Sequence, residues 1–346
     1  MKIKGELTEL SRFGEFRLIE HLTESFGLKN KSSIKGVGDD AAVIHHGKNM
    51  MVLTTDLLVE GIHFNLMYSP LKHLGYKSVV VGLSDIYAMN ARPEQIMVSI
   101  AVSNKISVES LEEFYTGIKL ACERYQVDLV GGDTSSSMTG MMISVTVLGS
   151  ALKEKLVYRS GAGMNDLICV SGNLGAAYAG LQVLERERRI FESDKGIQPD
   201  LTGYDYILER QLKPEARKDI IDILDKAEIL PTSMIDISDG LSSDIMHICK
   251  QSNVGCRIYQ EKIPIDEETA KTARELNLEP LICALNGGED YELLFTVPLN
   301  KSEIVTGMTG ISVIGHITGP DWGKKLVTKD GGEVVLKAQG WNDPEK

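Results

Sequence analysis

The sequence GVGDDAAVI, residues 36–44, places two adjacent aspartates between a Gly-Val-Gly turn and an apolar run. The apolar run should draw this loop against a core, where the carboxylates of Asp39 and Asp40 repel each other because the surroundings screen charge poorly. A charge that leaves water needs a partner of opposite sign or several hydrogen bonds. Compensating positive charge is therefore expected beside these two side chains.

Composition limits the classes of partner. The chain has 346 residues, which favours two domains of roughly 150 residues each. Its 37 basic and 49 acidic residues give a net charge of −12, and no run of lysine or arginine occurs. This charge argues against nucleic acid and anionic membrane surfaces as partners. A phosphate ligand remains compatible with it, because bound metal ions supply positive charge locally.

Cysteine usage and the N-terminal sequence indicate the compartment. Five dispersed cysteines form no CxxC pair and read as reduced structural thiols: Cys122, Cys169, Cys249, Cys256 and Cys283. The first ten residues, MKIKGELTEL, lack the apolar core of a signal peptide. The long uncharged stretches 134–152 and 167–184 are broken by turn residues, so neither is expected to span a membrane. The sequence predicts a cytoplasmic protein.

Helical and alternating patterns succeed one another along the whole chain. Helices are expected near 13–26, 70–90, 107–125 (with Ser107 as N-cap), 174–187, from Pro214 to 228 and 240–252. Strands are expected in AAVIHHGKNMMVLTTDLL (two, around a turn), EQIMVSIAVS, VDLVGGDTSSS (ending in a glycine-rich loop), MMISVTVLGSAL, DLICV, MIDI, YELLFTVP and ISVIGHITG. The charged segment 187–205 shows least pattern and reads as a mobile insertion. The fold class is α+β or α/β in two domains, 1–152 and 153–346.

Carboxylates recur where a strand meets a turn, or just after one. They are Asp39, Asp40, Asp56, Asp85, Asp133, Asp236, Asp239, Glu289 and Asp290. Any single one is adequately explained as a turn residue or helix cap, as Asp239 before Gly240 illustrates. Caps do not explain the whole set, and converging carboxylates require cations. Oxygen ligands without a Cys/His cluster suit magnesium, which in proteins often also holds substrate phosphates.

Familiar nucleotide-binding motifs are absent from the sequence. No GxxxxGK[ST] loop occurs, and no kinase-type GxGxxG accompanied by an HRD sequence. GVGDDA and GNLGAA resemble phosphate-binding loops only loosely. A nucleotide enzyme with this sequence would belong to a different class.

Eight motifs resemble those of the thiamine-monophosphate kinases in their order and approximate spacing. They are GEFRLIE, GVGDDAAV, TTDLLVEGIHF, GYKSVVVGLSDIYAMNARP, LVGGDT, RSGAGMNDLICVSGNLG, IDISDGLSSD and NGGEDYELLFTVP. The resemblance covers residue 13 to about 320. It implies the two-domain fold of aminoimidazole ribonucleotide synthetase, with an N-terminal domain that forms a homodimer and a C-terminal α/β domain. It also implies ATP-dependent phosphorylation of thiamine monophosphate to thiamine diphosphate by direct in-line transfer, assisted by several Mg²⁺ ions.

The same resemblance implies roles for individual residues. Those that match magnesium-holding positions are Asp40, Thr54, Thr55, Asp56, Asp85, Asp133, Asp236 and Asp239. Those that match ATP contacts are Tyr115, Gly132, Asp133, Arg159 and Ser238, and those that match substrate contacts are His63, Glu289 and Trp341. Trp341 lies in QGWNDPEK, which keeps the family's aromatic residue and lacks its His-Phe pair. No nucleophile or base is assigned, because phosphoryl transfer needs mainly positioning and charge neutralisation.

Structural alternatives stand beside several of these assignments. His63 also fits a packed histidine at a strand end, and Tyr115 lies at helical spacing from Leu111, Phe114 and Ile118, which favours core packing. Arg159 fits either a surface position or a phosphate clamp. Two other functions are compatible with the motifs. One is another ATP-using enzyme of the same fold, and the other is a non-catalytic regulator that binds magnesium and nucleotide.

Overall fold

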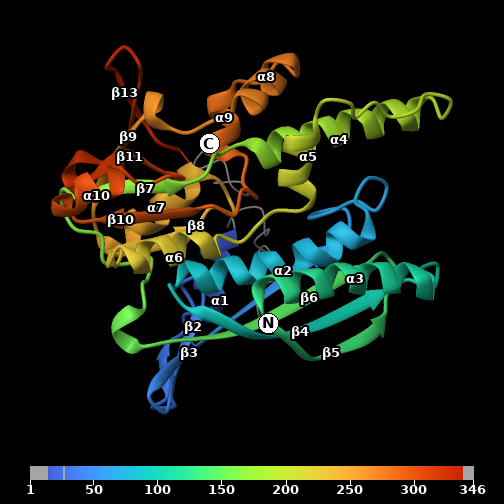
Figure 1. The fold of residues 1–346 in the computed structure, drawn as a ribbon, viewed down its shortest axis with the longest axis horizontal. Helices are drawn as coiled ribbons and strands as arrows, with labels where there is room; N and C mark the ends of the chain where they lie inside the picture. The colour runs from blue at the N-terminus through green and yellow to red at the C-terminus, as the bar shows by residue number, and fades with distance from the viewer. Residues whose placement is uncertain (1–14, 26–27, 338–346) are drawn as a thin grey trace, which may run out of the picture.

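The computed structural model describes residues 15–25 and 28–337 of the chain. Each half of the chain forms its own sheet, and the two halves are stacked with helix α2 between them (Figure 1). This arrangement confirms the expected mixed α/β fold class. Among the described residues, no helix combines the length and the apolar character that crossing a membrane requires.

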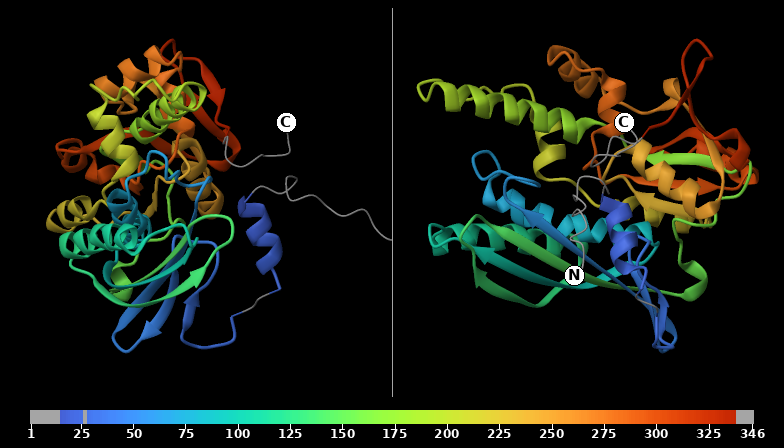
Figure 2. Two further views of the ribbon diagram at one scale, coloured as in Figure 1. Left: turned by 90° about the vertical axis from the view of Figure 1, so that its right-hand side faces the viewer. Right: turned by 180° about the vertical axis from the view of Figure 1, so that it is seen from behind.

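The N-terminal half is a six-stranded sheet with helices on one face. Its elements are α1 (Glu15–Thr23), β1 (Ser33–Lys35), β2 (Ala42–His46), β3 (Asn49–Val59), α2 (Leu71–Ala88), β4 (Arg92–Val102), α3 (Val108–Tyr125), β5 (Asp128–Ser136) and β6 (Met142–Ala151). The strand order is β1-β2-β3-β6-β4-β5. Helices α2 and α3 lie on the face toward the other half, and α1 stands beside the sheets (Figures 1 and 2). The predicted Ser107 cap is present, since its hydroxyl accepts the Ser110 N–H at 3.2 Å.

Strand β5 differs from the expectation of a short strand followed by a glycine-rich loop. It continues through both glycines to Ser136 and pairs in parallel with β4 as the last strand of the sheet. Gly132 permits this pairing, because a Cβ there would lie 1.8 Å from the carbonyl oxygen of Val98. The glycines therefore bring two backbones close together rather than ending the strand.

The C-terminal half is a seven-stranded sheet with helices around it. Its elements are β7 (Leu167–Ser171), α4 (Ala176–Ser193), α5 (Asp205–Leu212), α6 (Lys218–Lys226), β8 (Ser233–Asp236), α7 (Leu241–Ser252), β9 (Gly255–Tyr259), α8 (Glu267–Glu275), α9 (Pro280–Asn286), β10 (Leu293–Val297), α10 (Ser302–Thr306), β11 (Ile311–Thr318), β12 (Lys324–Val327) and β13 (Glu333–Val335). The strand order is β13-β12-β9-β11-β7-β10-β8. Strand β8 therefore lies at one end of the sheet, and it is the strand that faces α2.

The helix expected from Pro214 begins later than predicted, and the segment 187–205, predicted as a mobile insertion, contains regular structure at its start. Helix α6 begins at Lys218, four residues after Pro214, because residues 213–217 form a connection whose side chains engage other elements. The segment 187–205 is not an irregular insertion throughout, since α4 continues to Ser193 and projects beyond its sheet (Figure 1). The side chain of Glu187 is buried and accepts the Asp200 N–H at 3.0 Å, which ties the following loop to the helix.

Helix α2 joins the two halves because most of its surface is apolar and buried. Its buried residues form a continuous run from Leu74 to Leu83 and include Tyr87 and Ala88. One hydrophobic core cluster contains residues of this helix, of the N-terminal sheet and of the C-terminal half. A helix that is apolar on most faces needs cover on most faces. The second half of the chain supplies the cover that the N-terminal sheet cannot.

A polar cluster around Glu215 also connects the halves. The Glu215 carboxylate accepts hydrogen bonds from the hydroxyls of Tyr76 (2.7 Å) and Tyr125 (2.5 Å) and from Arg124 Nε (2.8 Å). The Tyr125 hydroxyl in turn accepts the Ala216 N–H at 2.9 Å. Both tyrosines are buried, so their hydroxyls depend on this one carboxylate.

Replacing Glu215 by alanine should lower the melting temperature markedly. Two buried hydroxyls would lose their acceptor, and each unsatisfied group costs about 1–3 kcal/mol. Calorimetry should show a loss of about 2 kcal/mol or more. The matched control is Asp225→Ala, which removes an ion pair with Lys155 that is 3.0 Å long and half exposed, so the melting temperature should change little. Equal effects would contradict the role of Glu215.

Candidate active site

Three aspartates from different elements meet at the junction of the two halves. Asp40 precedes β2, Asp85 belongs to α2 and Asp236 ends β8. Each offers a carboxylate oxygen, and these oxygens lie within 4.8 Å of one another. Asp40 and Asp236 are only 6% and 2% exposed, so water screens this cluster poorly.

Consecutive residues of α2 hold the cluster together. The Thr54 hydroxyl on β3 donates to Asp85 Oδ2 at 2.6 Å, which fixes Asp85 against the N-terminal sheet. The Ser84 hydroxyl donates to Asp236 Oδ2 at 2.7 Å and is fully buried, which fixes the end of β8 against α2. Asp85 lies within α2, as the helix expected over 70–90 requires, so its grouping with the carboxylates at strand ends was wrong.

Burial and mutual repulsion raise the pKa values of these carboxylates. Burial raises the pKa of Asp56 to about 6. Burial, followed by the charge of Asp40, raises the pKa of Asp236 to about 7. Burial and then the charges of Asp56, Asp236 and Asp40 raise the pKa of Asp85 well above its usual range. These groups remain ionised together at neutral pH only if positive charge is supplied.

Part of that positive charge comes from Arg159. Its Nη2 lies 2.9 Å from Asp40 Oδ1, and its backbone N–H donates to Asp39 Oδ1 at 3.1 Å. Lys35 Nζ lies 3.2 Å from Asp39 Oδ2. Burial still raises the pKa of Asp40 despite Arg159. Asp39 is therefore balanced by protein groups, whereas Asp40 and its neighbours carry negative charge that protons or a bound cation would have to offset.

The donor set fits divalent magnesium. Asp40 Oδ2 and Asp56 Oδ2 are buried and accept no hydrogen bond from the described residues. Asp40, Asp85 and Asp236 offer oxygen ligands at the spacing of a single ion, with Thr54 and Asp56 beside them. Hard oxygen ligands without sulfur or imidazole favour magnesium over zinc. Buried carboxylate oxygens without donors are what an oxygen-seeking cation requires.

Strand geometry separates the two neighbouring threonines. Residues alternate between the faces of β3, so Thr54 and Asp56 face α2 while Thr55 faces the opposite side. The Thr55 hydroxyl is exposed and lies 3.1 Å from that of Thr146 on β6. Within this chain, the Thr55 side chain is not brought to the cluster.

The loop after β8 lies beside Asp236 and carries two further predicted residues. Asp239 is half-buried and its charge raises the pKa of the buried Asp244, after the larger effect of burial on that group. Ser238 is exposed, and its carbonyl accepts the Glu289 N–H at 2.8 Å. The loop after β8 thus connects the acidic cluster to the loop that carries Glu289.

Three predicted ATP contacts lie elsewhere in the chain. Gly132 and Asp133 are exposed on β5, where Asp133 is in register with Ser99 of β4. Two strands, β4 and β6, separate β5 from β3. Tyr115 on α3 packs partly buried against the core, with its ring 5.7 Å from that of Phe114. The structure does not bring these residues to the acidic cluster of the same chain.

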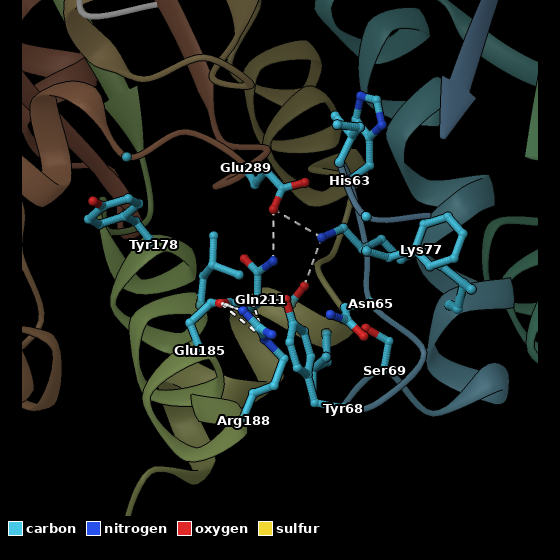
Figure 3. Close-up of a pocket in the computed structure, with 17 residues that line it drawn as sticks. His63, Asn65, Tyr68, Ser69, Lys77, Tyr178, Glu185, Arg188, Gln211 and Glu289 are labelled. Carbon is cyan, nitrogen blue, oxygen red and sulfur yellow. Dashed lines mark hydrogen bonds and ion pairs between the residues drawn. The ribbon is translucent and has the colours of Figure 1, made fainter. Parts of the chain in front are cut away.

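A cavity of about 520 Å³ adjoins the site and holds His63 and Glu289 (Figure 3). The Glu289 carboxylate accepts hydrogen bonds at Oε2 from Lys77 Nζ (3.1 Å) and Gln211 Nε2 (2.8 Å). The His63 ring accepts the Val59 N–H at Nδ1 over 3.0 Å. Trp341, the third predicted substrate contact, lies outside the described residues.

The sequence interpretation missed several residues of this cavity. Tyr68 donates to Glu185 at 2.9 Å, and Arg188 Nη2 lies 2.8 Å from the same carboxylate. Lys77 is only 4% exposed and binds the Gln211 carbonyl at 3.0 Å as well as Glu289. A lone lysine in the apolar helical stretch GYKSVVVGLS was a signal for a functional position. The α4 residues carried no comparable signal, because charged residues are common on helix surfaces.

A second cavity, of about 710 Å³, opens beside Arg159. It is lined by Arg159, Asp39, parts of α1 and the α7 residues His247, Lys250 and Gln251. Lys250 pairs with Glu20 of α1, and Gln251 donates to the Gly38 carbonyl at 2.5 Å. The segment that carries Asp39 and Asp40 therefore borders this second cavity, and Glu289 borders the first.

Comparison with known proteins identifies relatives over almost the whole chain. Residues 38–151 match the family described as AIR synthase related protein, N-terminal domain, and residues 166–324 match its C-terminal domain. A thiamine-monophosphate kinase of Aquifex aeolicus is 34% identical over 97% of this chain and 98% of its own length. That of Bacillus subtilis is 32% identical over 95% and 98%.

Solved structures agree with these relatives. The structure of AaThiL complexed with AMPPCP and TMP has a TM-score of 0.82 and 32% identity, covering 97% of this chain and 99% of that one. The hydrogenase maturation protein HypE in complex with ATP has a TM-score of 0.68 at 19% identity, over 92% and 94%. At that identity the likeness concerns the fold alone.

Raising the pH should destabilise the metal-free protein. The folded-state pKa values of Asp56 and Asp236, about 6 and 7, lie above the ordinary value of 3.8. The stabilisation from binding these protons is complete below about pH 4 and is lost as pH rises through 6 and 7. In EDTA, the melting temperature should fall by about 5 °C or more between pH 5 and 8.

Magnesium should remove most of that decrease, because a cation replaces the lost protons. Asp236→Asn is the matched variant, and it should flatten the pH dependence in EDTA. Scanning calorimetry of both proteins with and without Mg²⁺ makes the measurement. A wild-type melting temperature that rises between pH 5 and 8 in EDTA would contradict this account of the cluster.

Proposed function

The chain belongs to the AIR synthase related family and, within it, to the thiamine-monophosphate kinases, and on this premise we propose a magnesium-assisted in-line mechanism. A phosphate oxygen of thiamine monophosphate attacks the γ-phosphorus of ATP. The bond from the γ-phosphorus to the bridging oxygen of ADP breaks, and thiamine diphosphate forms. The observation that carries the proposal is the buried cluster of Asp40, Asp85 and Asp236 beside a cavity.

The chain's own residues would hold and neutralise the reacting phosphates. Asp40, Asp85 and Asp236 would bind magnesium, with Asp56 and Thr54 completing the surroundings. The bound ions would supply the positive charge that draws the phosphate groups together. The attacking oxygen is already deprotonated at neutral pH, so the chain needs no general base and no nucleophile of its own.

We assign the nucleotide to the side of the cluster that carries Arg159. Its guanidinium is held by Asp40, which aims a permanent positive charge at the cluster. Ser238 and Asp239 border the same region from the loop after β8. Four further residues are proposed to contact nucleotide or metal: Tyr115, Gly132, Asp133 and Thr55. Because they are exposed or lie far from the acidic cluster of their own chain, we propose that they reach the site of a partner subunit.

We assign thiamine monophosphate to the cavity with His63 and Glu289. Thiamine carries a positively charged ring, which the aromatic rings of Tyr68 and Tyr178 in this cavity would favour, while the carboxylates of Glu185 and Glu289 are paired with Arg188 and Lys77. Both hydrogen bonds to Glu289 end on Oε2, and its other oxygen faces the side where His63 lies (Figure 3). Trp341 is proposed as a further ring contact from the C-terminal segment.

A homodimer is proposed to form through the uncovered face of the N-terminal sheet. Helices α2 and α3 cover one face only (Figure 1). Leu57 and Met97 are 57% and 39% exposed on the other face, next to the Thr55–Thr146 pair, and Leu129 and Val130 are exposed on the edge strand. Apolar side chains on a flat sheet face favour association. We also propose a cytoplasmic location, which suits the five free cysteines.

The reaction is tested by product analysis. Purified protein with Mg-ATP should convert thiamine monophosphate to thiamine diphosphate, releasing one ADP per product, and should leave free thiamine unchanged. Glu289→Gln should raise the KM for thiamine monophosphate about tenfold with little change in that for ATP, because it removes a charge from the acceptor cavity. ATP binding without any diphosphate product would redirect the search to other acceptors.

The dimer is tested by a charge on the uncovered sheet face. Leu57→Arg should shift the sedimentation-equilibrium mass from that of two chains to that of one, since an unpaired charge in an apolar interface is costly. Leu299→Arg is the control, because Leu299 is similarly exposed (56%) and belongs to the C-terminal half. A wild-type protein that sediments as a single chain would refute the proposal.

A further inference from the structure

The loop 287–292, which joins α9 to β10, has a backbone conformation that most residues avoid. The φ angles of Glu289 and Tyr291 are +57° and +51°, in the left-handed region where a side chain crowds its own backbone. Two such residues in one short loop are maintained only where the surrounding structure holds them. Whatever holds this loop therefore decides where the Glu289 carboxylate lies.

The loop's other two acidic residues are anchored away from the cavity. Asp290 and Glu292 are fully buried, with exposed fractions of 0% and 1%. The Asp290 carboxylate accepts N–H groups of Gly175 (2.7 Å) and Ala177 (3.4 Å) at the start of α4. Glu292 accepts the Ser171 hydroxyl at 2.5 Å. The Glu289 side chain thus lines the cavity, whereas those of Asp290 and Glu292 are buried in an anchor behind it.

Arg210 contacts both anchoring carboxylates and two backbone carbonyl groups. Its Nη1 lies 3.0 Å from Glu292 Oε1. Its Nη2 donates to the carbonyl oxygens of Asp290 (3.1 Å) and Asn173 (3.2 Å) and lies 3.8 Å from the Asp290 carboxylate. The guanidinium therefore binds the backbone between the two left-handed residues as well as the side chains that anchor them.

The next residue on α5 reaches the opposite side of the loop. Gln211 Nε2 donates to Glu289 at 2.8 Å (Figure 3). We propose that Arg210 is a positioning residue, which fixes residues 289–291 so that Glu289 faces the acceptor cavity. The positioning itself is a property of the protein alone, and only the identity of the acceptor rests on the proposed function.

Arg217 provides a matched control for Arg210. It pairs with the same carboxylate of Glu292, and its side chain is 15% exposed against 16% for Arg210. Within residues 15–25 and 28–337, its hydrogen bonds go to the side chains of Glu292 and Asp219 and not to the loop backbone. If the arginines only stabilise the buried charge network, replacing either one should loosen the 287–292 loop to a similar degree. If Arg210 positions the loop, its replacement should loosen the loop much more than that of Arg217.

Hydrogen exchange of the substrate-free protein tests the proposal directly. The Glu289 and Tyr291 amides donate to the carbonyls of Ser238 (2.8 Å) and Ile237 (2.9 Å). In Arg210→Gln, exchange in peptides covering 287–292 should accelerate tenfold or more, and in Arg217→Gln less than threefold. Equal acceleration, or none, would overturn the proposal. If Arg210→Gln does not fold, Arg210→Lys replaces it, since lysine lacks the fork that binds two carbonyls.

Kinetics supply the second test. Arg210→Gln should raise the KM for thiamine monophosphate about tenfold and change that for ATP less than twofold. Adding Glu289→Gln should produce no further increase, because both changes remove the same contact. Additive increases would overturn the proposal. If the wild-type protein does not phosphorylate thiamine monophosphate, the proposed function fails, and hydrogen exchange still decides whether Arg210 positions the loop.

Discussion

Asp40, Asp85 and Asp236 come from three separate elements, yet their oxygens approach within 4.8 Å in a place that water barely reaches. Like charges so close together in poorly screened surroundings oppose folding unless protons or cations bind. The fold does not relieve this repulsion by spreading the carboxylates apart. It holds them in place with hydroxyl donors from Thr54 and Ser84 and offsets one of them with Arg159.

Helix α2 is the element that makes this arrangement rigid. Ser84 and Asp85 bind the cluster, while Lys77, two turns earlier on the same face, binds Glu289 in the neighbouring cavity. The rise of an α-helix places residues 77 and 84 about 10 Å apart along the axis. One helix thus sets the spacing between the acidic cluster and the cavity that holds Glu289. The same helix carries Tyr76, whose hydroxyl binds Glu215 of the second half.

Local sequence patterns predicted much of the fold and only part of the site. The helix at 70–90 and the strands around the HHGKN turn follow from periodicity and turn residues, which act over a few neighbours. The continuation of β5 through its glycines depends on pairing with β4, which no local pattern reveals. In the same way Pro214 suggested a helix start, but residues 213–217 are engaged with other elements and the helix begins later.

The acidic residues show the same limit. Their number pointed to cations, but the sequence did not distinguish Asp40, Asp85 and Asp236, which meet, from Asp133, which lies on an exposed edge strand. Side-chain direction was equally hidden for the adjacent Thr54 and Thr55 until the strand and its partners were known. Lys77 could have been noticed as a lone lysine in an apolar helical stretch, whereas the place of Arg210 beside the 287–292 loop is recognised only from its contacts.

The two sites are mechanically linked through the short loops that follow β8 and α9. Asp236 ends β8, and the next two residues provide the carbonyls that bind the Glu289 and Tyr291 amides. The Ser84 hydroxyl binds Asp236 to α2, and Lys77 of the same helix binds Glu289. The acidic cluster and the Glu289 loop are therefore held both by one helix and by the short stretch of chain that follows β8.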